Sequence, residues 1–369
     1  MIDVITDITA LSYFRMPPQY RAMCPPICTG AHDACRKELR RNPTSAEIGL
    51  PFHVLVGDRG ARTNSVNIKQ HLFLEEMLPG WTYETELGFE ATSPLLTAFI
   101  LSRRVSDLEL LLVLSEMLGS FAAYRPSEGI ESALCGAIES KQMPAHIGWE
   151  RFPSDGFMPS NLWKREPLVT EEELIEFCKD IKDYRGARRF TKIAGAVPCG
   201  VASPFEAETA LLMSLPRDRG GAGFAHVAYN VQIKLSSEAR AIAGKDRVYI
   251  DILLVSDDGT RQVAIECQGR ATHGAQGAGL KDAARMTALQ SMGYRVFLIT
   301  HDQIKDAAQF ETIVKAVCFE LGMKYAKRTS NETDSTELLR RRLFLNWTDL
   351  GVKRENFERD KRLNMLWRL

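Results

Sequence analysis

The pattern of apolar and polar positions changes near residue 200. From Val201 to Ile304 it predicts, in order, a helix, three strands, a second helix, a strand and a closing helix. The predicted strands are apolar on both faces, so helices are expected on both sides of a mixed sheet. We therefore predict an α/β protein with this mixed sheet, flanked by helices, in its C-terminal half.

Upstream, the pattern predicts an α+β domain over residues 1–123. The stretches "FHVLVG" and "SVNIKQHLFL" predict strands, and residues 92–118 carry apolar side chains at helical spacing. Thr92 or Ser93 suits the N-cap of the first helix, because Pro94 follows at its first position. Residues 1–50 contain several proline turn signals and are expected to be irregular.

The remaining segments connect or extend these domains. Residues 124–168 are rich in proline, glycine and polar residues and are expected to form a linker or long loop. Connecting helices are predicted over residues 169–200, the first capped by Thr170. A basic helical tail is predicted over residues 323–369. Its arginines suit contact with DNA phosphates and its Leu and Trp side chains suit packing on the protein, and the sequence leaves both open.

Composition fits a protein of two or more domains, because 369 residues exceed the size of one ordinary core. The chain has 47 basic and 47 acidic residues, so its net charge does not indicate nucleic-acid binding by the whole molecule. It lacks an apolar run of membrane-spanning length and a signal-peptide pattern. With cysteines scattered in apolar contexts, this predicts a cytoplasmic protein with reduced thiols and no membrane partner.

Two acidic residues are predicted to face each other in the C-terminal sheet. Asp258-Gly259 is a strong two-residue hairpin signal, because both central residues of a type I′ turn need positive φ. With that pair as the loop, Asp251 on one strand lies directly opposite Glu266 on the next. Gln268 lies two residues further along and shares their face of the sheet.

Carboxylates that face each other between apolar residues lose hydration and repel one another. Three arrangements relieve this: one acid holds a proton, a Lys or Arg pairs with both, or a divalent cation binds between them. Mg²⁺ takes one or two carboxylates plus waters, and the phosphate of a substrate completes its shell. Gln268 carries no charge, but its amide can hydrogen-bond a water or a phosphate oxygen.

The residues around the strand "VAIECQ" resemble the PD-(D/E)XK nuclease superfamily. More narrowly, residues 200–305 resemble the domain of unknown function related to very-short-patch-repair (Vsr-like) endonucleases. The Ser-Pro-x-Glu start of a helix selects Glu206, and the other matching residues are Glu266, Gly269, His273, Asp282, Arg285 and Gly293. The resemblance implies a restriction-endonuclease-like domain over residues 201–322.

This resemblance implies a Mg²⁺-dependent or Mn²⁺-dependent deoxyribonuclease that hydrolyses phosphodiester bonds in DNA. Asp251 and Glu266 would bind the metal, and Arg285 would face a phosphate. The implied catalytic residues are Glu206, Asp251, Glu266, Gln268 and His273.

The main departure is Gln268, at a position where the superfamily favours lysine, although some restriction endonucleases have glutamine there. Other matches have simple alternative roles: Glu206 as a partner of the helix dipole, His273 as a loop residue, and Asp282 with Arg285 as a pair on one helix. The rival function is therefore a catalytically inactive nuclease fold that acts as an antitoxin-like or DNA-binding accessory factor.

The upstream region is more weakly similar to the segment that precedes this domain in actinobacterial proteins. That segment is related to the AbiEi family of abortive-infection antitoxins, and the matches include "ITDITALSYFRMP" and "EATSPLLTAFILSRRVSDLELLLVLSEML". The similarity adds a toxin–antitoxin partner, or a homodimer, to DNA as expected partners.

One further cluster, in "CPPICTGAHDAC", consists of Cys24, Cys28, His32 and Cys35. Four soft ligands within one short segment suit a structural Zn²⁺. The spacing is not that of a common zinc knuckle, so free thiols in a proline-rich loop are the alternative.

Overall fold

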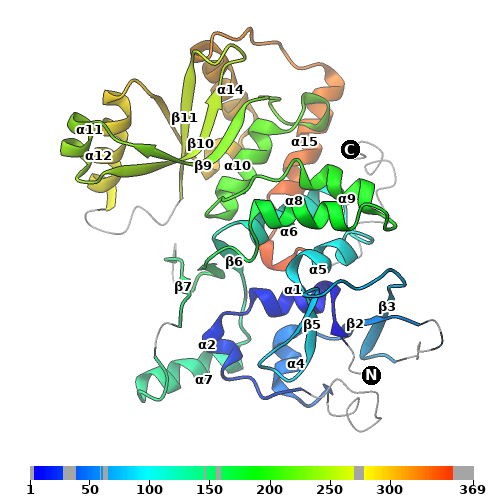
Figure 1. The fold of residues 1–369 in the computed structure, drawn as a ribbon. Helices are drawn as coiled ribbons and strands as arrows, with labels where there is room; N and C mark the ends of the chain where they lie inside the picture. Colours follow the sequence, from blue (N-terminus) through cyan, green and yellow to red (C-terminus); the bar gives the residue numbers. More distant parts are fainter. Residues whose placement is uncertain are drawn as a thin grey trace.

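The computed structural model describes residues 4–27, 39–58, 60, 65–144, 147–154, 159–269 and 278–351, with the backbone alone for 278–282. Within these ranges, helices pack around three β-sheets, so the predicted α/β class is confirmed. The two larger sheets lie at opposite ends of the molecule, and a layer of helices lies between them (Figure 1).

A five-stranded sheet forms the N-terminal end, in the order β3-β2-β1-β5-β4. Its β2–β3 and β1–β5 pairs are parallel, and its β1–β2 and β4–β5 pairs are antiparallel. The predicted strands in "FHVLVG" and "SVNIKQHLFL" are confirmed as β2 and β3. The strands are β1 (Val4–Ile5), β2 (Phe52–Val56), β3 (Ile68–Leu72), β4 (Thr82–Glu84) and β5 (Glu90–Thr92).

The helical pattern over residues 92–118 forms α5 (Pro94–Leu101) and α6 (Asp107–Leu118). Ser93 caps α5 by accepting the N–H of Leu96, as expected for Ser before Pro. Ser106 and Glu109 form a reciprocal capping box on α6. Helix α6 is buried along nearly all its length, because elements from both halves of the chain pack on it.

Residues 1–50 were expected to be irregular, and this prediction is wrong for the described part. That part contains β1 and the helices α1 (Asp7–Arg15), α2 (Pro18–Arg21) and α4 (Pro43–Ile48). Pro18 and Pro43 stand at the first position of their helices, where a missing N–H costs nothing, rather than in a loop. Helix α1 packs against α5 and β2, so tertiary burial stabilises a helix too short to persist alone.

The linker expected over residues 124–168 is also wrong, because its described parts are folded. They contain α7 (Glu128–Glu139), β7 (Glu150–Arg151) and β8 (Leu162–Lys164), and β6 (Phe121–Ala123) precedes them in a sheet of order β6-β8-β7. Trp163 of β8 is buried, and its indole N–H donates to the carbonyl of Tyr124. The prolines and glycines therefore mark turns between short elements that a large aromatic side chain anchors.

Helices α8 (Glu171–Asp180) and α9 (Ala187–Ala194) occupy the stretch predicted as connecting helices. Thr170 forms a capping box with Glu173 at the start of α8, as predicted. Phe177 of α8 and Phe190 of α9 both meet Phe99 of α5 edge to face. The two helices are thus part of the N-terminal core as well as a connection.

A four-stranded sheet forms the C-terminal end, in the order β12-β11-β10-β9. The β11–β12 pair is parallel and the other two are antiparallel, so the predicted mixed sheet is confirmed. Its strands are β9 (Val227–Lys234), β10 (Arg247–Val255), β11 (Gln262–Gln268) and β12 (Arg295–Thr300). The helices are α10 (Pro204–Ser214), α11 (Ser237–Ala243), α12 (Ala278–Ser291), α13 (His301–Lys305) and α14 (Ala307–Glu320), of which α11 and α13 were not predicted.

The β10–β11 hairpin has the predicted register. Ile252 pairs with Ile265, and the same register continued by one residue would put Asp251 opposite Glu266. The Asp251 carboxylate does reach the next residue of β11, where it accepts the N–H of Cys267. Because the two strands keep this register to the turn, the sequence alone was enough to place the two acidic residues beside each other.

The turn of this hairpin differs from the predicted type I′ geometry. The N–H of Ser256 donates to the carbonyl of Arg261 at 2.9 Å, so the loop covers residues 257–260. Gly259 has a φ of 73°, whereas Asp258 is not among the described non-glycine residues with positive φ. Instead, the Asp258 carboxylate accepts from the hydroxyl of Ser256 and the N–H of Thr260, which orders the longer loop.

The side chains of β9 and β10 change faces in the middle of the sheet. Ile250 packs with α11 and α12 on one face, whereas Ile252 packs with α10 and α14 on the other. Between them lies Asp251, beside Asn230 of β9, which has a left-handed φ of 47°. Such a residue breaks the pleat, so Asp251 lies where the strand changes sides.

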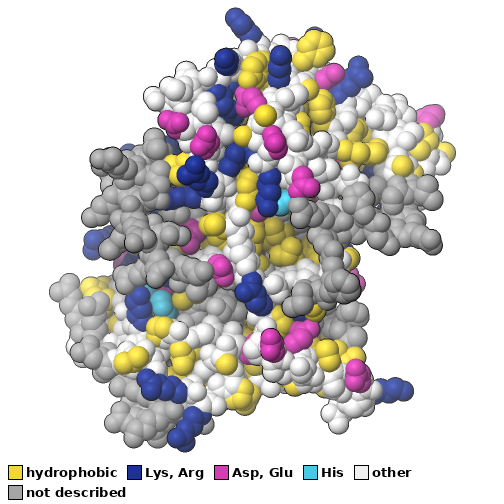
Figure 2. Space-filling model, turned by 180° about the vertical axis from the view of Figure 1, so that it is seen from behind, with side chains coloured by type: hydrophobic (Ala, Val, Ile, Leu, Met, Phe, Trp, Pro, Cys, Tyr) yellow, Lys and Arg dark blue, Asp and Glu magenta, His cyan; other side chains and the backbone are white. Residues whose placement is uncertain are grey.

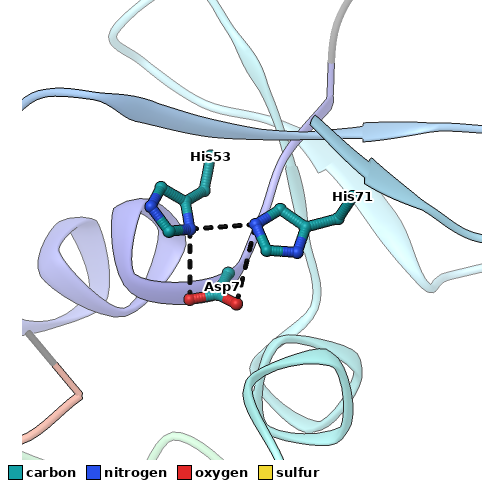
Figure 3. Close-up of side chains that lie close together, drawn as sticks. All are labelled: Asp7, His53 and His71. Atoms are coloured by element: carbon teal, nitrogen blue, oxygen red, sulfur yellow. Dashed lines mark hydrogen bonds and ion pairs between the residues drawn. The ribbon is translucent and has the colours of Figure 1, made fainter. Parts of the chain in front are cut away.

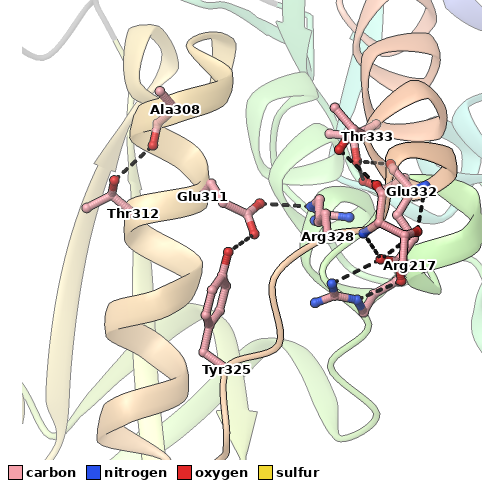
Figure 4. A network of polar contacts seen from close by, with 11 residues as sticks. Arg217, Ala308, Glu311, Thr312, Tyr325, Arg328, Glu332 and Thr333 are labelled. Carbon is pink, nitrogen blue, oxygen red and sulfur yellow. Dashed lines mark hydrogen bonds and ion pairs between the residues drawn. The ribbon is translucent and has the colours of Figure 1, made fainter.

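The C-terminal segment folds back onto the protein as α15 (Ser330–Leu343) and the 3-10 helix η3 (Trp347–Asp349). Figure 4 shows the polar contacts that hold it: Arg328 donates to Glu311 of α14 at 2.8 Å. Arg217, in the short helix η1 (Arg217–Arg219), donates to Glu332 of α15 at 2.9 Å. Gly220 lets the two helices approach, because a Cβ there would lie 2.5 Å from the carbonyl oxygen of Ser335.

A single buried apolar cluster reaches from β1 to η3 and includes one face of the C-terminal sheet. Trp347 of η3 lies edge to face on Phe121 of β6, and its indole N–H donates to Glu208 of α10 at 2.9 Å. Arg15 of α1 and Glu116 of α6 form a buried ion pair inside this cluster. The two halves of the chain therefore share one core.

Candidate active site

The candidate site lies where α10, β10, β11 and α12 meet. The structure brings four predicted residues to this place: Glu206 in the first turn of α10, Asp251 in β10, Glu266 near the end of β11 and Arg285 in α12. Gln268 ends β11 and pairs with Thr300 of β12, where it is half-buried. Pairing of β10 with β11 thus supplies the two central acids, and helices α10 and α12 supply Glu206 and Arg285.

Glu206 is held by the start of its own helix. Its carboxylate accepts the N–H of Ala202 at 2.6 Å and the hydroxyl of Ser203 at 3.0 Å, while Ser203 accepts the N–H of Glu206. Burial and the charge of Asp251 raise the pKa of Glu206 above its usual range. The residue therefore caps the helix and also interacts electrostatically with the predicted site.

Asp251 and Glu266 meet different partners. Asp251 accepts the backbone N–H of Cys267 at 2.7 Å. Glu266 is 1% exposed, and the Arg285 guanidinium lies 2.6 Å from its carboxylate and also donates to the carbonyl of Tyr249. Three arrangements were considered that relieve a buried acid pair: a shared proton, a basic side chain or a divalent cation. The structure shows a basic side chain, Arg285, which contacts Glu266.

The thiol of Cys267 is buried close to the acidic residues of the site. Burial, then the charges of Asp251 and Glu206, raise the pKa of its thiol well above the usual range. The thiol is therefore neutral at physiological pH. The same field disfavours any further negative charge here unless a cation is added.

Two predicted residues of this site cannot be placed. His273, and the side chain of Asp282 in α12, lie outside the described residues. Arg285 was considered as a helix partner of Asp282, and the structure gives it Glu266 as a partner from another element.

The acidic residues supply hard oxygen donors, which suit Mg²⁺. Among the described side chains, however, Glu206, Asp251 and Glu266 do not bring three ligand atoms within 4.8 Å of one another. One or two carboxylates with waters are sufficient for Mg²⁺, so the donor chemistry of Asp251 and Glu266 fits a divalent cation when the arginine charge is displaced from Glu266.

A second cluster, which the sequence did not single out, lies between the N-terminal sheet and the start of α1. Asp7, His53 and His71 place one possible ligand atom each within 4.8 Å of one another (Figure 3). Burial alone would raise the pKa of Asp7, but hydrogen bonds from His53 and Arg104 hold it well below its usual range. Burial lowers the pKa of His71 to about 4. Both histidines lie in segments that were predicted as strands. Only pairing of these two strands, with both histidines on the same face, could have suggested a site.

The cysteine cluster considered for Zn²⁺ lies mostly outside the described residues. Of its four members, Cys24 alone is described, and it is a buried free cysteine. Burial raises the pKa of its thiol to about 11. Cys28, His32 and Cys35 lie outside the described residues.

Charge on one face of the protein is mixed rather than segregated. Figure 2 shows Lys and Arg side chains interspersed with Asp and Glu on the face seen from behind. In the described part of the predicted basic tail, Arg340 is buried and donates to the carbonyl of Ile304, while Arg341 is exposed and pairs with Glu337. Arg340 is therefore committed to packing, and part of the tail's charge serves the fold.

Comparisons with protein-family models, with curated proteins and with solved structures gave no match to this chain. Among the described helices, none combines the length and the apolar character needed to cross a bilayer.

Proposed function

We propose that this protein has a nuclease-like domain of the PD-(D/E)XK type, related to Vsr-like endonucleases, and hydrolyses phosphodiester bonds in DNA. The observation that carries the proposal is the β10–β11 register, which, continued one residue beyond the Ile252–Ile265 pair, would put Asp251 opposite Glu266 at the point where β10 changes faces. Glu206 lies in electrostatic contact with Asp251 from the helix that precedes the sheet.

Each residue has a role that its surroundings support. Asp251 and Glu266 would hold Mg²⁺ or Mn²⁺, which when bound would polarise the phosphate and a water. Glu206, fixed by its bonds from Ala202 and Ser203, would orient the water that attacks the phosphate. Arg285 neutralises Glu266 in the absence of other charges and is long enough to pair with a substrate phosphate instead. Gln268 stands in the usual place of lysine and offers an amide to water or phosphate.

A second candidate function has its own supporting observation. The contact between Arg285 and Glu266 already neutralises a buried carboxylate, so the site has a stable arrangement without metal. An inactive nuclease fold that acts as a DNA-binding or antitoxin-like accessory factor, with a toxin-like partner or a second copy, is consistent with that contact. The weak similarity of the N-terminal half to AbiEi-related regions favours the same alternative.

A cleavage assay separates the two functions. Supercoiled and mismatched DNA would be incubated with the full-length protein and Mg²⁺, Mn²⁺ or a chelator. The nuclease proposal expects metal-dependent nicking by the wild type, and a loss of about 100-fold or more in Glu266→Ala and Glu266→Gln, since both remove the negatively charged carboxylate that would bind the metal. Gln268→Lys is expected to retain or raise the activity.

Asp257→Asn serves as the matched control, because this exposed acid lies in the turn at the other end of the same hairpin. It should cleave like the wild type. If neither the wild type nor Gln268→Lys nicks DNA with either metal, the nuclease proposal fails. DNA binding by such an inactive protein would then support the accessory role.

A further inference from the structure

The N-terminal cluster of Asp7, His53 and His71 is assembled from three separate elements. His53 on β2 and His71 on β3 share one face of a parallel strand pair, since the register places His53 opposite Lys69 and His71 opposite Leu55. Asp7 begins α1 directly beneath them, and all three side chains point toward one another (Figure 3).

The spacing of the donor atoms matches the edges of a metal coordination shell. His53 Nδ1 lies 2.9 Å from His71 Nε2 and 3.3 Å from Asp7 Oδ1, and His71 Nε2 lies 3.7 Å from Asp7 Oδ2. Two ligands of a tetrahedral Zn²⁺ with bonds of 2.0–2.1 Å are separated by roughly 3.3 Å. The observed distances fall on both sides of this value, so small side-chain rotations would fit the ion.

The two imidazoles indicate what such an ion would replace. Two nitrogen lone pairs cannot lie 2.9 Å apart unless a proton lies between them, so one ring donates to the other. A metal ion would take the place of that proton and accept both lone pairs. Nδ1 of His53 and Nε2 of His71 already face each other and the Asp7 carboxylate, so the two lone pairs converge without a large rearrangement (Figure 3).

The surrounding structure fixes the three residues. The backbone N–H of His53 donates to the Thr9 hydroxyl, and its carbonyl accepts the N–H of Thr6. Asp7 has a left-handed φ of 55°, an unfavourable conformation for a non-glycine residue that persists where the surroundings demand it. These contacts fix the backbone of His53 and Asp7, so they set where both side chains start before any ion binds.

The two oxygens of the Asp7 carboxylate differ in the number of hydrogen bonds they accept. The Arg104 guanidinium and the N–H of Ile8 converge on Asp7 Oδ1, while Oδ2 accepts Arg104 Nε at 2.8 Å. Oδ2, which has one short contact, is the oxygen that faces His71. Arg104 keeps the Asp7 carboxylate ionised and fixes its orientation toward His71. Its positive charge would weaken cation binding relative to a site without an arginine.

We propose that Asp7, His53 and His71 bind one transition-metal ion, with Zn²⁺ as the best match to two imidazoles and a carboxylate. Three protein ligands leave a coordination position for water, as in open zinc sites rather than closed structural ones. His71, with 19% of its side chain exposed, borders the solvent side of the cluster. The site is separate from the carboxylates of the C-terminal sheet, and its test does not depend on nuclease activity.

The test uses the full-length protein, stripped with a chelator and titrated with Zn²⁺ by calorimetry, with metal content measured after dialysis. The wild type should bind one equivalent. Asp7→Asn and His71→Gln should weaken binding by more than about 100-fold, since even outer-shell changes cost about 10- to 100-fold. Asn tolerates the left-handed φ and still accepts from Arg104, so Asp7→Asn should fold.

His226→Gln is the matched control, because His226 is an exposed histidine elsewhere on the protein. It should retain full binding. A wild type that takes up no Zn²⁺ overturns the proposal, and so does a folded Asp7→Asn or His71→Gln variant that keeps its equivalent.

Replacement of Zn²⁺ by Co²⁺ in the wild type gives a readout that does not rely on variants. Nitrogen and oxygen ligands should give weak visible bands without a thiolate charge-transfer band in the near ultraviolet. A thiolate band would place the ion on cysteines, such as those near Cys24, and would overturn the assignment to Asp7, His53 and His71.

Discussion

Two buried carboxylates, Asp7 at the start of α1 beside the N-terminal sheet and Glu266 in the C-terminal sheet, are paired with arginine in different surroundings. Asp7 accepts several bonds from Arg104 and has two imidazoles as neighbours. Glu266 contacts Arg285, and Asp251 binds the N–H of the next residue, Cys267. The first environment offers nitrogen donors that suit Zn²⁺, and the second offers only oxygen donors that suit Mg²⁺. The neighbours of a buried acid, rather than its arginine, thus decide which metal it suits.

The largest contrast is expected from removing each arginine. Arg104→Ala should lower the free energy of unfolding by about 3–5 kcal/mol, because Asp7 is fully buried and would lose its main countercharge. Arg285→Ala should cost less, about 1–2 kcal/mol, because Arg285 is one-third exposed and water can take its place beside Glu266. Denaturant unfolding followed by circular dichroism measures both, and equal losses would contradict the contrast.

Burial raises the pKa of both Glu208 and Asp7, and the two acids differ in how far hydrogen bonds and neighbouring charges offset it. Burial raises the pKa of Glu208 to about 7, against the hydrogen bond from Trp347, whereas the pKa of Asp7 is lowered. Between about pH 4.5 and 7 the folded protein therefore holds a proton on Glu208 that the unfolded chain releases, so this group's contribution to stability falls as pH rises.

Glu208→Gln removes this dependence. Relative to the wild type, the variant should gain about 2–3 kcal/mol of unfolding free energy between about pH 5 and pH 8. Unfolding curves at the two pH values measure the gain. A difference between the proteins that does not change with pH would show that Glu208 does not titrate in this window.

A smaller effect is expected at the place where β9 and β10 change faces. Asn230→Val should cost about 1–2 kcal/mol, because a β-branched residue is strained at the left-handed φ of 47°. Asn230→Gly, the control, should be close to neutral. If both variants unfold like the wild type, the left-handed conformation at Asn230 is not needed to position Asp251.

The smallest effect is expected at the hairpin turn. Gly259→Ala should cost about 1 kcal/mol, because its φ is positive but a Cβ there would meet no atom within 4 Å. The register that pairs Ile252 with Ile265 should persist, and hydrogen exchange across β10 and β11 would report it. Loss of protection throughout both strands would show that the turn, and not the strand pattern, sets the register.

Local signals in the sequence predicted much of the fold. Ser93 and Thr170 cap helices as expected, because a cap depends on residues only a few positions away. The hairpin register was correct although the turn type was not, because a four-residue loop can close the same ladder.

What the sequence did not predict depends on contacts between distant residues. Helices α1 and α7 were missed because they are short or weakly patterned and gain stability from packing. The cluster of Asp7, His53 and His71 was missed because its three elements meet only after β1, β2 and β3 have paired. An arginine on the acid pair was one of three arrangements that the sequence left open. The choice between them depends on which side chains meet in the folded protein, and no local sequence pattern reports that.

The shared core has a consequence for any ligand screen. Because one apolar cluster joins the N-terminal sheet, α6, α10 and Trp347, a ligand bound at either end stabilises a single cooperative unit. A rise in melting temperature would then report that an ion binds, but not where. Assigning a metal to the histidine cluster or to the carboxylates will require variants at each site, measured in the intact chain.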